Sequence, residues 1–268
     1  MQGAELIIAL KLAFRARLTS MLVWITLALI LAVLLSAQFS GRQPATVALD
    51  VGLSVIRLAL PLVIVFLAQE FFSREFDRRY FLTSLSYPRP RWQFLLGRFF
   101  GMLGIVLATL AFLGALLALL VGFVGQGYDQ ATPVALGTPY ITTLGFIGQD
   151  LLVIAAIATL LGIVAITPSF VLIGTFGFLL VARSYAGIID LLENERYVVD
   201  NPELYQSSLG ILRYLLPDLG ALDVRRIALY NHWEFLPEQW LMLLITSLTY
   251  ALALLAISAW LLNRKQFS

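Results

Sequence analysis

Six apolar stretches of transmembrane length run through this 268-residue sequence and constrain its fold more than any other feature. A helix needs about 20 mostly apolar residues to cross a hydrocarbon core of about 30 Å. The stretches cover residues 18–37, 47–69, 99–124, 145–166, 169–189 and 239–262. Together with the turns between them they use nearly all of the sequence. We therefore expect one all-α integral membrane domain over residues 1–268, with six transmembrane helices and no appended soluble domain.

The composition agrees with this interpretation. Hydrophobic residues make up 60% of the sequence and charged residues 13%, and the mean hydropathy is +0.89. Soluble domains are roughly 45–50% apolar, and a water-soluble fold could not bury this much apolar surface. The first stretch is also longer than the roughly 7–15 apolar residues of a secretory signal peptide. We therefore expect it to be the first transmembrane helix.

Lysine and arginine gather at the ends of alternate stretches. They are Lys11, Arg15 and Arg17 before the first span, six arginines between the second and the third, and Arg264 and Lys265 after the last. The opposite ends carry Arg42, and no Lys or Arg occurs between residues 125 and 140. Because short positively charged loops stay in the cytoplasm, we expect both termini to be cytoplasmic. The positive charges thus indicate membrane orientation and not a nucleic-acid partner.

Two segments outside the spans are also expected to contain helix. Residues 1–17 are weakly amphipathic, which favours an N-terminal helix along the cytoplasmic interface; a simple extension of the first span is the alternative. Residues 190–238 form a long external loop in this topology, and residues 209–222 are apolar enough to lie in the outer interface as part of a helical loop before the last span. The Tyr and Trp side chains of this loop suit the aromatic belt of a membrane protein.

The sequence contains no recognisable catalytic, cofactor-binding or metal site. The phosphate-binding pattern G-x-x-x-x-G-K-[ST] does not occur, and the two lysines, Lys11 and Lys265, do not follow a glycine-rich loop. With one histidine, His232, and no cysteine, a zinc or copper cage is not expected. The chain is therefore not expected to be an enzyme by itself or to hydrolyse ATP in the P-loop manner.

Four charged residues fall inside or at the edge of the expected spans: Asp50, Arg57, Asp150 and Arg183. A charge at the centre of a membrane helix costs roughly 2.5–3.5 kcal/mol on insertion scales, so such residues are rarely incidental. Arg57 lies near the middle of its span, on the same helix face as Asp50 two turns away. Arg183 and Asp150 lie nearer the outer boundary, where Arg183 could extend to the interface. These residues either line a substrate path or form a buried pair that fixes helix packing.

The segment between the second and third spans is the most distinctive part of the sequence. Its charged residues include Glu70, Arg74, Glu75, Arg78 and Arg79, and it ends in Pro88 and Arg91 before the Leu96-Gly97-Arg98 step. The pairs Glu70 with Arg74 and Glu75 with Arg79 have the i, i+4 spacing that supports a helix. We therefore expect a short charged helix on the cytoplasmic side, followed by a turn at the proline.

This segment resembles the permease subunits of ABC-2 type exporters, in which a glutamate after the second span opens a cytoplasmic helix that ends in Pro-x-x-Arg. Glu75, Pro88 and Arg91 fit these places, whereas Asp77 to Tyr80 replace the family's Gly-Thr and Arg98 replaces its lysine. Residues 215–223 are similar to a Leu-Pro-Asn-Leu segment in the branch associated with multicopper-enzyme maturation.

The resemblance implies a permease that dimerises in the inner membrane of a bacterium or archaeon. Two separate cytoplasmic ATPase subunits would bind ATP and Mg, and residues 70–91 would couple them to the spans. Two other classes remain open from the residues alone: a secondary transporter or channel, and a structural membrane subunit of a larger complex. Secondary transporters often contain internal repeats around a midplane site, and the sequence offers no convincing repeat.

Overall fold

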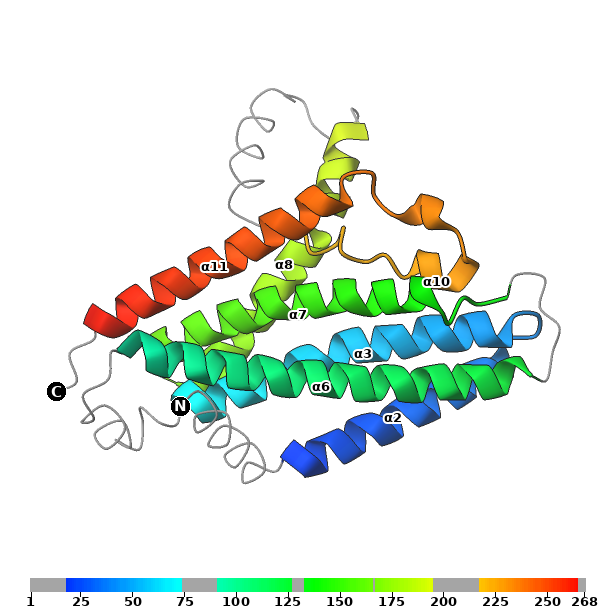
Figure 1. The fold of residues 1–268 in the computed structure, drawn as a ribbon, viewed down its shortest axis with the longest axis horizontal. Coiled ribbons are helices and arrows are strands. Elements are labelled where there is room, and N and C mark those ends of the chain that lie inside the picture. Colours follow the sequence, from blue (N-terminus) through cyan, green and yellow to red (C-terminus); the bar gives the residue numbers. More distant parts are fainter. Residues whose placement is uncertain (1–17, 74–90, 127–132, 166, 195–216, 265–268) are drawn as a thin grey trace.

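The computed structural model describes residues 18–73, 91–126, 133–165, 167–194 and 217–264 (Figure 1). Within these residues the chain is all helical and contains no strand. The elements are α2 (Leu18–Phe39), α3 (Pro44–Ala68), the π-helical turn η1 (Gln69–Ser73), α6 (Arg91–Gly125), α7 (Thr138–Val164), α8 (Pro168–Asn194), α10 (Arg226–Tyr230), the 3₁₀ turn η2 (Trp233–Phe235) and α11 (Trp240–Arg264). The expected N-terminal helix, most of the cytoplasmic segment and the first half of the external loop lie outside the described residues.

Five of the described helices are long and apolar enough to cross a membrane: α2, α3 with η1, α6, α7 and α11. They match five of the six expected spans, and they are consistent with a multi-pass membrane protein. The remaining expected span, at residues 169–189, corresponds to α8, in which the shorter stretch Pro168–Ser184 is apolar. The all-helical membrane class is therefore confirmed, with five candidate spans.

Several helices begin earlier than the apolar stretches predict. Helix α6 begins at Arg91 and not at residue 99, and α7 begins at Thr138 and not at residue 145. Hydropathy locates the apolar part of a helix, whereas the backbone hydrogen-bond ladder continues until proline or a cap interrupts it. Proline opens several of these helices: Pro44 is the first residue of α3, Pro168 is the first residue of α8, and Pro139 lies in the first turn of α7. Proline suits these places because its missing N–H is not needed there.

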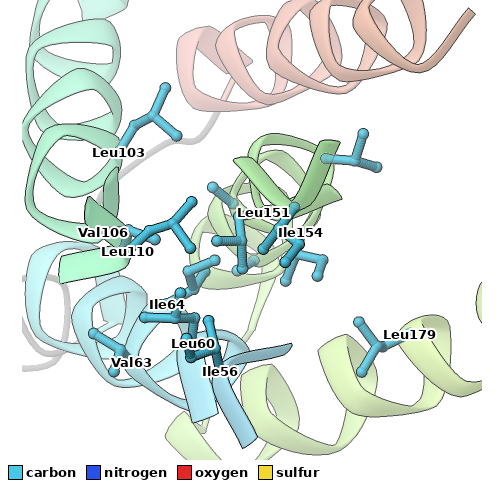
Figure 2. Close-up of a cluster of buried hydrophobic side chains, with 14 of the residues drawn as sticks. Ile56, Leu60, Val63, Ile64, Leu103, Val106, Leu110, Leu151, Ile154 and Leu179 are labelled. Atoms are coloured by element: carbon cyan, nitrogen blue, oxygen red, sulfur yellow. The ribbon is translucent and has the colours of Figure 1, made fainter. Parts of the chain in front are cut away.

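The core of the bundle is formed chiefly by α3 and α7. In their most apolar 18-residue stretches, 61% of the residues of α3 and 67% of those of α7 are buried, against 17% in α2 and 22% in α11. Figure 2 shows apolar side chains of α3 and α7 gathered between these helices, with Val106 and Leu110 of α6 beside them. The outer helices α2 and α11 instead expose large apolar side chains such as Trp24 and Leu252. Lipid would cover these faces in a membrane.

A buried tyrosine joins α6 to α7 at the end of the bundle where α7 begins. The Tyr140 hydroxyl donates a hydrogen bond to the backbone carbonyl of Gly114 at 2.7 Å. A side chain at Gly114 would lie close to Leu144, so the absence of a Cβ lets the two helices approach. Small residues commonly allow such approach between membrane helices, and interhelical hydrogen bonds add to the packing.

We predict that Tyr140→Phe lowers the free energy of unfolding by about 1 kcal/mol, because it removes one interhelical hydrogen bond from a buried site. The loss should appear as a lower thermal midpoint of the purified chain in detergent. Tyr250→Phe is the matched control, since it removes the same hydroxyl from a half-buried tyrosine and keeps the ring that stacks on Phe178. Equal midpoints for the two variants would contradict a role for the Tyr140 bond.

Candidate functional site

Residues 217–225, directly before α10, pack against the bundle without forming a helix. We call residues 217–225 the inserted segment. Its apolar side chains Leu219, Leu222 and Val224 are buried, each with at most 2% of its surface exposed. The Leu219 N–H donates to the carbonyl of Ala182 in α8 at 3.2 Å. The other six residues of the segment are half-buried, so it packs on the bundle through its three buried apolar side chains.

Gly220 permits the close approach of the inserted segment to α8. A Cβ at this position would lie 2.8 Å from the backbone carbonyl oxygen of Arg183. Backbone atoms cannot move aside as the end of a flexible side chain can, so any larger residue would force the segment away from the helix. Two short turns keep the segment compact: Asp218 accepts a hydrogen bond from the Ala221 N–H at 3.0 Å, and the Asp223 N–H donates to the Gly220 carbonyl at 3.0 Å.

Helix α3 presents three polar residues toward this segment: Asp50, Ser54 and Arg57. Their spacing of four and three residues places them on one face of the helix. Arg57 lies about 20 Å along the axis from Pro44, at a rise of about 1.5 Å per residue, and is therefore near the middle of α3. Its side chain is 10% exposed. The sequence prediction that Arg57 faces the interior of the protein agrees with this placement.

Six charged side chains from four parts of the chain form a continuous network. Arg225 contacts Asp50 at 2.9 Å and Asp223 at 3.4 Å, Asp223 forms an ion pair with Arg57, and Asp150 accepts contacts from Arg57 at 3.5 Å and from Arg183 at 2.6 Å. We call these residues the ion network. It contains three arginines and three aspartates in alternation, so its formal charges cancel. A buried charge is tolerated when it is paired and hydrogen-bonded, and this arrangement pairs every charge.

The ion network becomes steadily less exposed from Asp50 to Asp150, and Arg183 beyond Asp150 is 23% exposed. The exposed fraction of the side chain falls from 47% at Asp50 and 33% at Arg225 to 26% at Asp223 and 0% at Asp150. The Ser54 hydroxyl, beside Asp50, accepts a hydrogen bond from Arg225 at 2.6 Å. The network is therefore a graded polar connection between the surface of the bundle and its interior.

All four charged residues singled out in the sequence lie in the ion network, but their partners differ from the simplest expectation. Asp50 does not pair directly with Arg57; Arg225 and Asp223 stand between them. Arg183 contacts Asp150 and the backbone carbonyl of Arg57, at 2.6 and 3.4 Å.

Asp223 and Arg225 were missed by reasoning from sequence. They belong to the loop before the last span, and its described residues 217–225 contact α3 and α8. One sequence feature could have pointed to them. Residues 219–229, around Asp223 and Arg225, contain more apolar residues than an exposed loop usually does. Such a pattern indicates that the segment is buried, but it does not identify the residues that the segment contacts.

Most of the residues expected to couple to an ATPase fall outside the described residues, and the two that are described, Glu70 and Arg91, lie outside the ion network. Arg74, Glu75, Arg78, Arg79 and Pro88 are not among the described residues, whereas Glu70 lies in η1 and Arg91 is the first residue of α6. The Arg91 guanidinium donates to the carbonyls of Leu262 and Asn263 at 3.0 and 3.2 Å. A cation at the C-terminal end of a helix is favourable because it faces the last unpaired carbonyls. Both ends of the 74–90 segment therefore lie at the same end of the bundle as the end of α11.

We predict that Gly220→Ala displaces the inserted segment, because the new methyl group would clash with the Arg183 carbonyl. In a Leu222→Cys background, the thiol should be protected from a water-soluble maleimide when Gly220 is present and should react when it is replaced. Gly177→Ala is the matched control, since no atom lies within 4 Å of a Cβ at that position in α8. Equal labelling rates in the two variants would contradict the close approach.

Comparison with models of protein families and with curated proteins gives no match for this chain. No group of three or more His, Cys, Asp or Glu residues that could hold a metal ion occurs in the part of the chain that the structure describes.

Proposed function

We propose that this chain is the transmembrane permease subunit of an ATP-driven exporter of the ABC-2 type. In this proposal the chain dimerises in the inner membrane of a bacterium or archaeon and couples to separate cytoplasmic ATPase subunits through residues 70–91. One observation carries the proposal beyond the sequence resemblance. Glu70 and Arg91, at the two edges of this segment, lie at the same end of the bundle as the C-terminal carbonyls of α11, so the segment leaves and re-enters at one place.

The distribution of charge supports a cytoplasmic position for this end. Arg91, Arg98 and Arg264 lie here in the described residues, together with four further arginines within residues 74–90 of the sequence, whereas the loop between α2 and α3 at the opposite end contains Arg42. Short loops rich in arginine stay on the cytoplasmic side. If α8 serves as the remaining span, there are six spans and both termini are cytoplasmic; its 27 residues would extend about 40 Å.

The proposed roles of the permease and the ATPase subunits follow from the absence of a phosphate-binding loop in the sequence. The chain has no phosphate-binding loop, so ATP and Mg would be bound by the partner ATPase and not by this subunit. Transport would then require two ATPase subunits below the membrane and a second permease subunit within it. The cytoplasmic segment, with carboxylates and arginines at helical spacing, is suited to docking on a charged partner.

The topology predicts a simple labelling pattern, since the chain contains no cysteine. Asn231→Cys, on the exposed turn after α10, should react with a membrane-impermeant maleimide in intact cells. Ser84→Cys, within residues 74–90, should react only after the membrane is permeabilised. The reverse pattern would invert the topology and remove the proposed ATPase contact from the cytoplasm.

We predict that Glu75→Ala and, separately, Arg79→Ala reduce ATPase co-purification in mild detergent without lowering the amount of inserted permease. An exposed pair within a helix contributes only about 0.3–0.5 kcal/mol to stability. A charge at a drier protein interface can contribute several kcal/mol to binding. Substrate-dependent ATP turnover of the reconstituted complex is the second measurement.

Glu238→Ala and Arg226→Ala are the matched controls, because each removes an exposed charge of the same sign at the opposite end of the bundle. Both should leave ATPase co-purification unchanged. If the variants in the 70–91 segment behave like these controls, the segment is an ordinary solvated loop. ATP turnover by rigorously pure single-chain protein would contradict the proposed function as a whole.

A secondary transporter or channel is the second candidate, and the ion network favours it specifically. Secondary transporters bind substrate near the midplane, where interrupted helices and charged groups meet. The inserted segment reaches Arg57 near the middle of α3, which is a comparable arrangement. Uptake by vesicles that contain only this chain, driven by a proton or sodium gradient without ATP, would support this candidate against the exporter.

A further inference from the structure

The buried part of the ion network does not balance on the transmembrane helices alone, because the fourth member on these helices, Asp50, is 47% exposed and contacts Arg225. Its innermost members on these helices are Arg57, Arg183 and Asp150, which sum to a formal charge of +1. Asp223 of the inserted segment supplies the negative charge that brings this group to zero. A net charge in the interior of a membrane protein is costly, so the helices require an anion at this place.

The anion is required by Arg57 in particular. Asp150 lies 2.6 Å from Arg183 but 3.5 Å from Arg57, so its carboxylate is engaged chiefly by Arg183. The remaining contacts of the Arg57 guanidinium are the Asp223 carboxylate and, at 3.4 Å, the Leu219 carbonyl, and both belong to the inserted segment. If the segment withdrew, Arg57 would retain only the longer contact to Asp150.

Besides the Asp223 to Arg57 ion pair and three buried apolar side chains, the inserted segment makes contacts that are partly exposed or few in number. Its outer ion pair, Arg225 with Asp50, is one-third to one-half exposed, and ion pairs that face water contribute little to stability. One backbone hydrogen bond ties it to α8, through Leu219. Segments with few backbone bonds to their surroundings are those that open most readily.

We propose that Arg57 is a binding site for an anionic group, a phosphate or a carboxylate, and that Asp223 occupies this site as an internal competitor. The site has spare donors for such a ligand, because the Nε–H groups of Arg57 and Arg183 are buried and have no acceptor in the part of the chain that the structure describes. An oxyanion with several acceptor oxygens could accept from them in addition to the donors that Asp223 engages.

The route to the site follows the graded exposure of the ion network, from Asp50 and Arg225 inward to Arg57. The neighbouring surface of α3 is apolar, with Leu58 and Leu62 exposed by 61% and 40%. A ligand that carries its anionic group on an apolar tail would fit both surfaces. The same anionic chemistry could also come from a free phosphate ion, so the test separates these two sources.

The test is equilibrium binding to the purified chain in a non-ionic detergent, with no ATPase present. The probes are dihexanoyl phosphatidic acid, dihexanoyl phosphatidylcholine and inorganic phosphate. Asp223→Asn should lower the dissociation constant for phosphatidic acid by about tenfold or more, because it removes the internal competitor and raises the population of the open site. Binding of inorganic phosphate with an equal gain would assign the site to a free anion, and a gain for phosphatidic acid alone would assign it to an amphiphile.

Glu234→Gln is the matched control, since it removes one exposed negative charge in η2, shortly after α10, and leaves the ion network intact. It should change the dissociation constant for phosphatidic acid by less than about twofold, which is small beside the tenfold change expected for Asp223→Asn. An equal gain in the two variants would mean general surface electrostatics and would overturn the proposal. The proposal would also be overturned if Asp223→Asn left the dissociation constant for phosphatidic acid unchanged. It would be overturned as well if Asp223→Asn increased the affinity for phosphatidylcholine as much as that for phosphatidic acid.

Two further measurements keep the proposal testable if Asp223→Asn folds poorly. Gly220→Ala leaves every charge in place but displaces the segment, so it should also increase affinity relative to Gly177→Ala. A disulfide between Ala182→Cys and Leu219→Cys should hold the segment in place and abolish binding, and reduction should restore it. If neither Gly220→Ala nor the disulfide changes the affinity for phosphatidic acid, Asp223 is not an internal competitor. Because no ATPase is involved, this inference can fail while the exporter proposal stands, and the reverse also holds.

Discussion

An arginine near the middle of a transmembrane helix must be neutralised within the protein, and this requirement organises one half of the structure. Arg57 contacts three acceptors from two other segments: Asp150 from α7, and Asp223 and the Leu219 carbonyl from the inserted segment. Arg183 then balances Asp150, and Arg225 connects Asp223 to Asp50. The non-helical path of residues 217–225 is stabilised in turn by its buried apolar side chains, and Gly220 lies against α8 without a side chain.

The helical part of the fold could be predicted from sequence because its cause is local. A run of about 20 apolar residues such as 18–37 has few alternatives to a spanning helix, and α2 follows it closely. The helix ends were less accessible, since α6 continues eight residues before the apolar run begins, at Arg91 rather than at residue 99. The partners of the buried charges were the least accessible. Asp223 is far from Arg57 in sequence, and only the insertion of its segment brings the two together.

The two ends of the bundle differ in chemical character. One end gathers arginine, the start of α6 and the end of α11, and its buried Arg98 lies among the rings of Phe71 and Phe94 at 5.8 and 5.3 Å. Toward the other end lies the half-exposed part of the ion network, together with α10 and the start of α7, joined by the Ala135 to Ala228 backbone bond. The positively charged end suits contact with a cytoplasmic partner, and the ion network suits recognition of a charged solute or lipid.

The hydrogen bonds of Arg91 have a mechanical consequence. They attach the first residue of α6 to the last turn of α11, so the two helix ends cannot separate without leaving carbonyls unpaired. Helix α11 is attached in turn to α7 next to Asp150, through the bond from Gln149 to Ser247 at 2.9 Å. A pull on the chain at Arg91 is thus resisted by α11 as well as by α6, and α11 bears on the residue beside the most deeply buried carboxylate of the molecule.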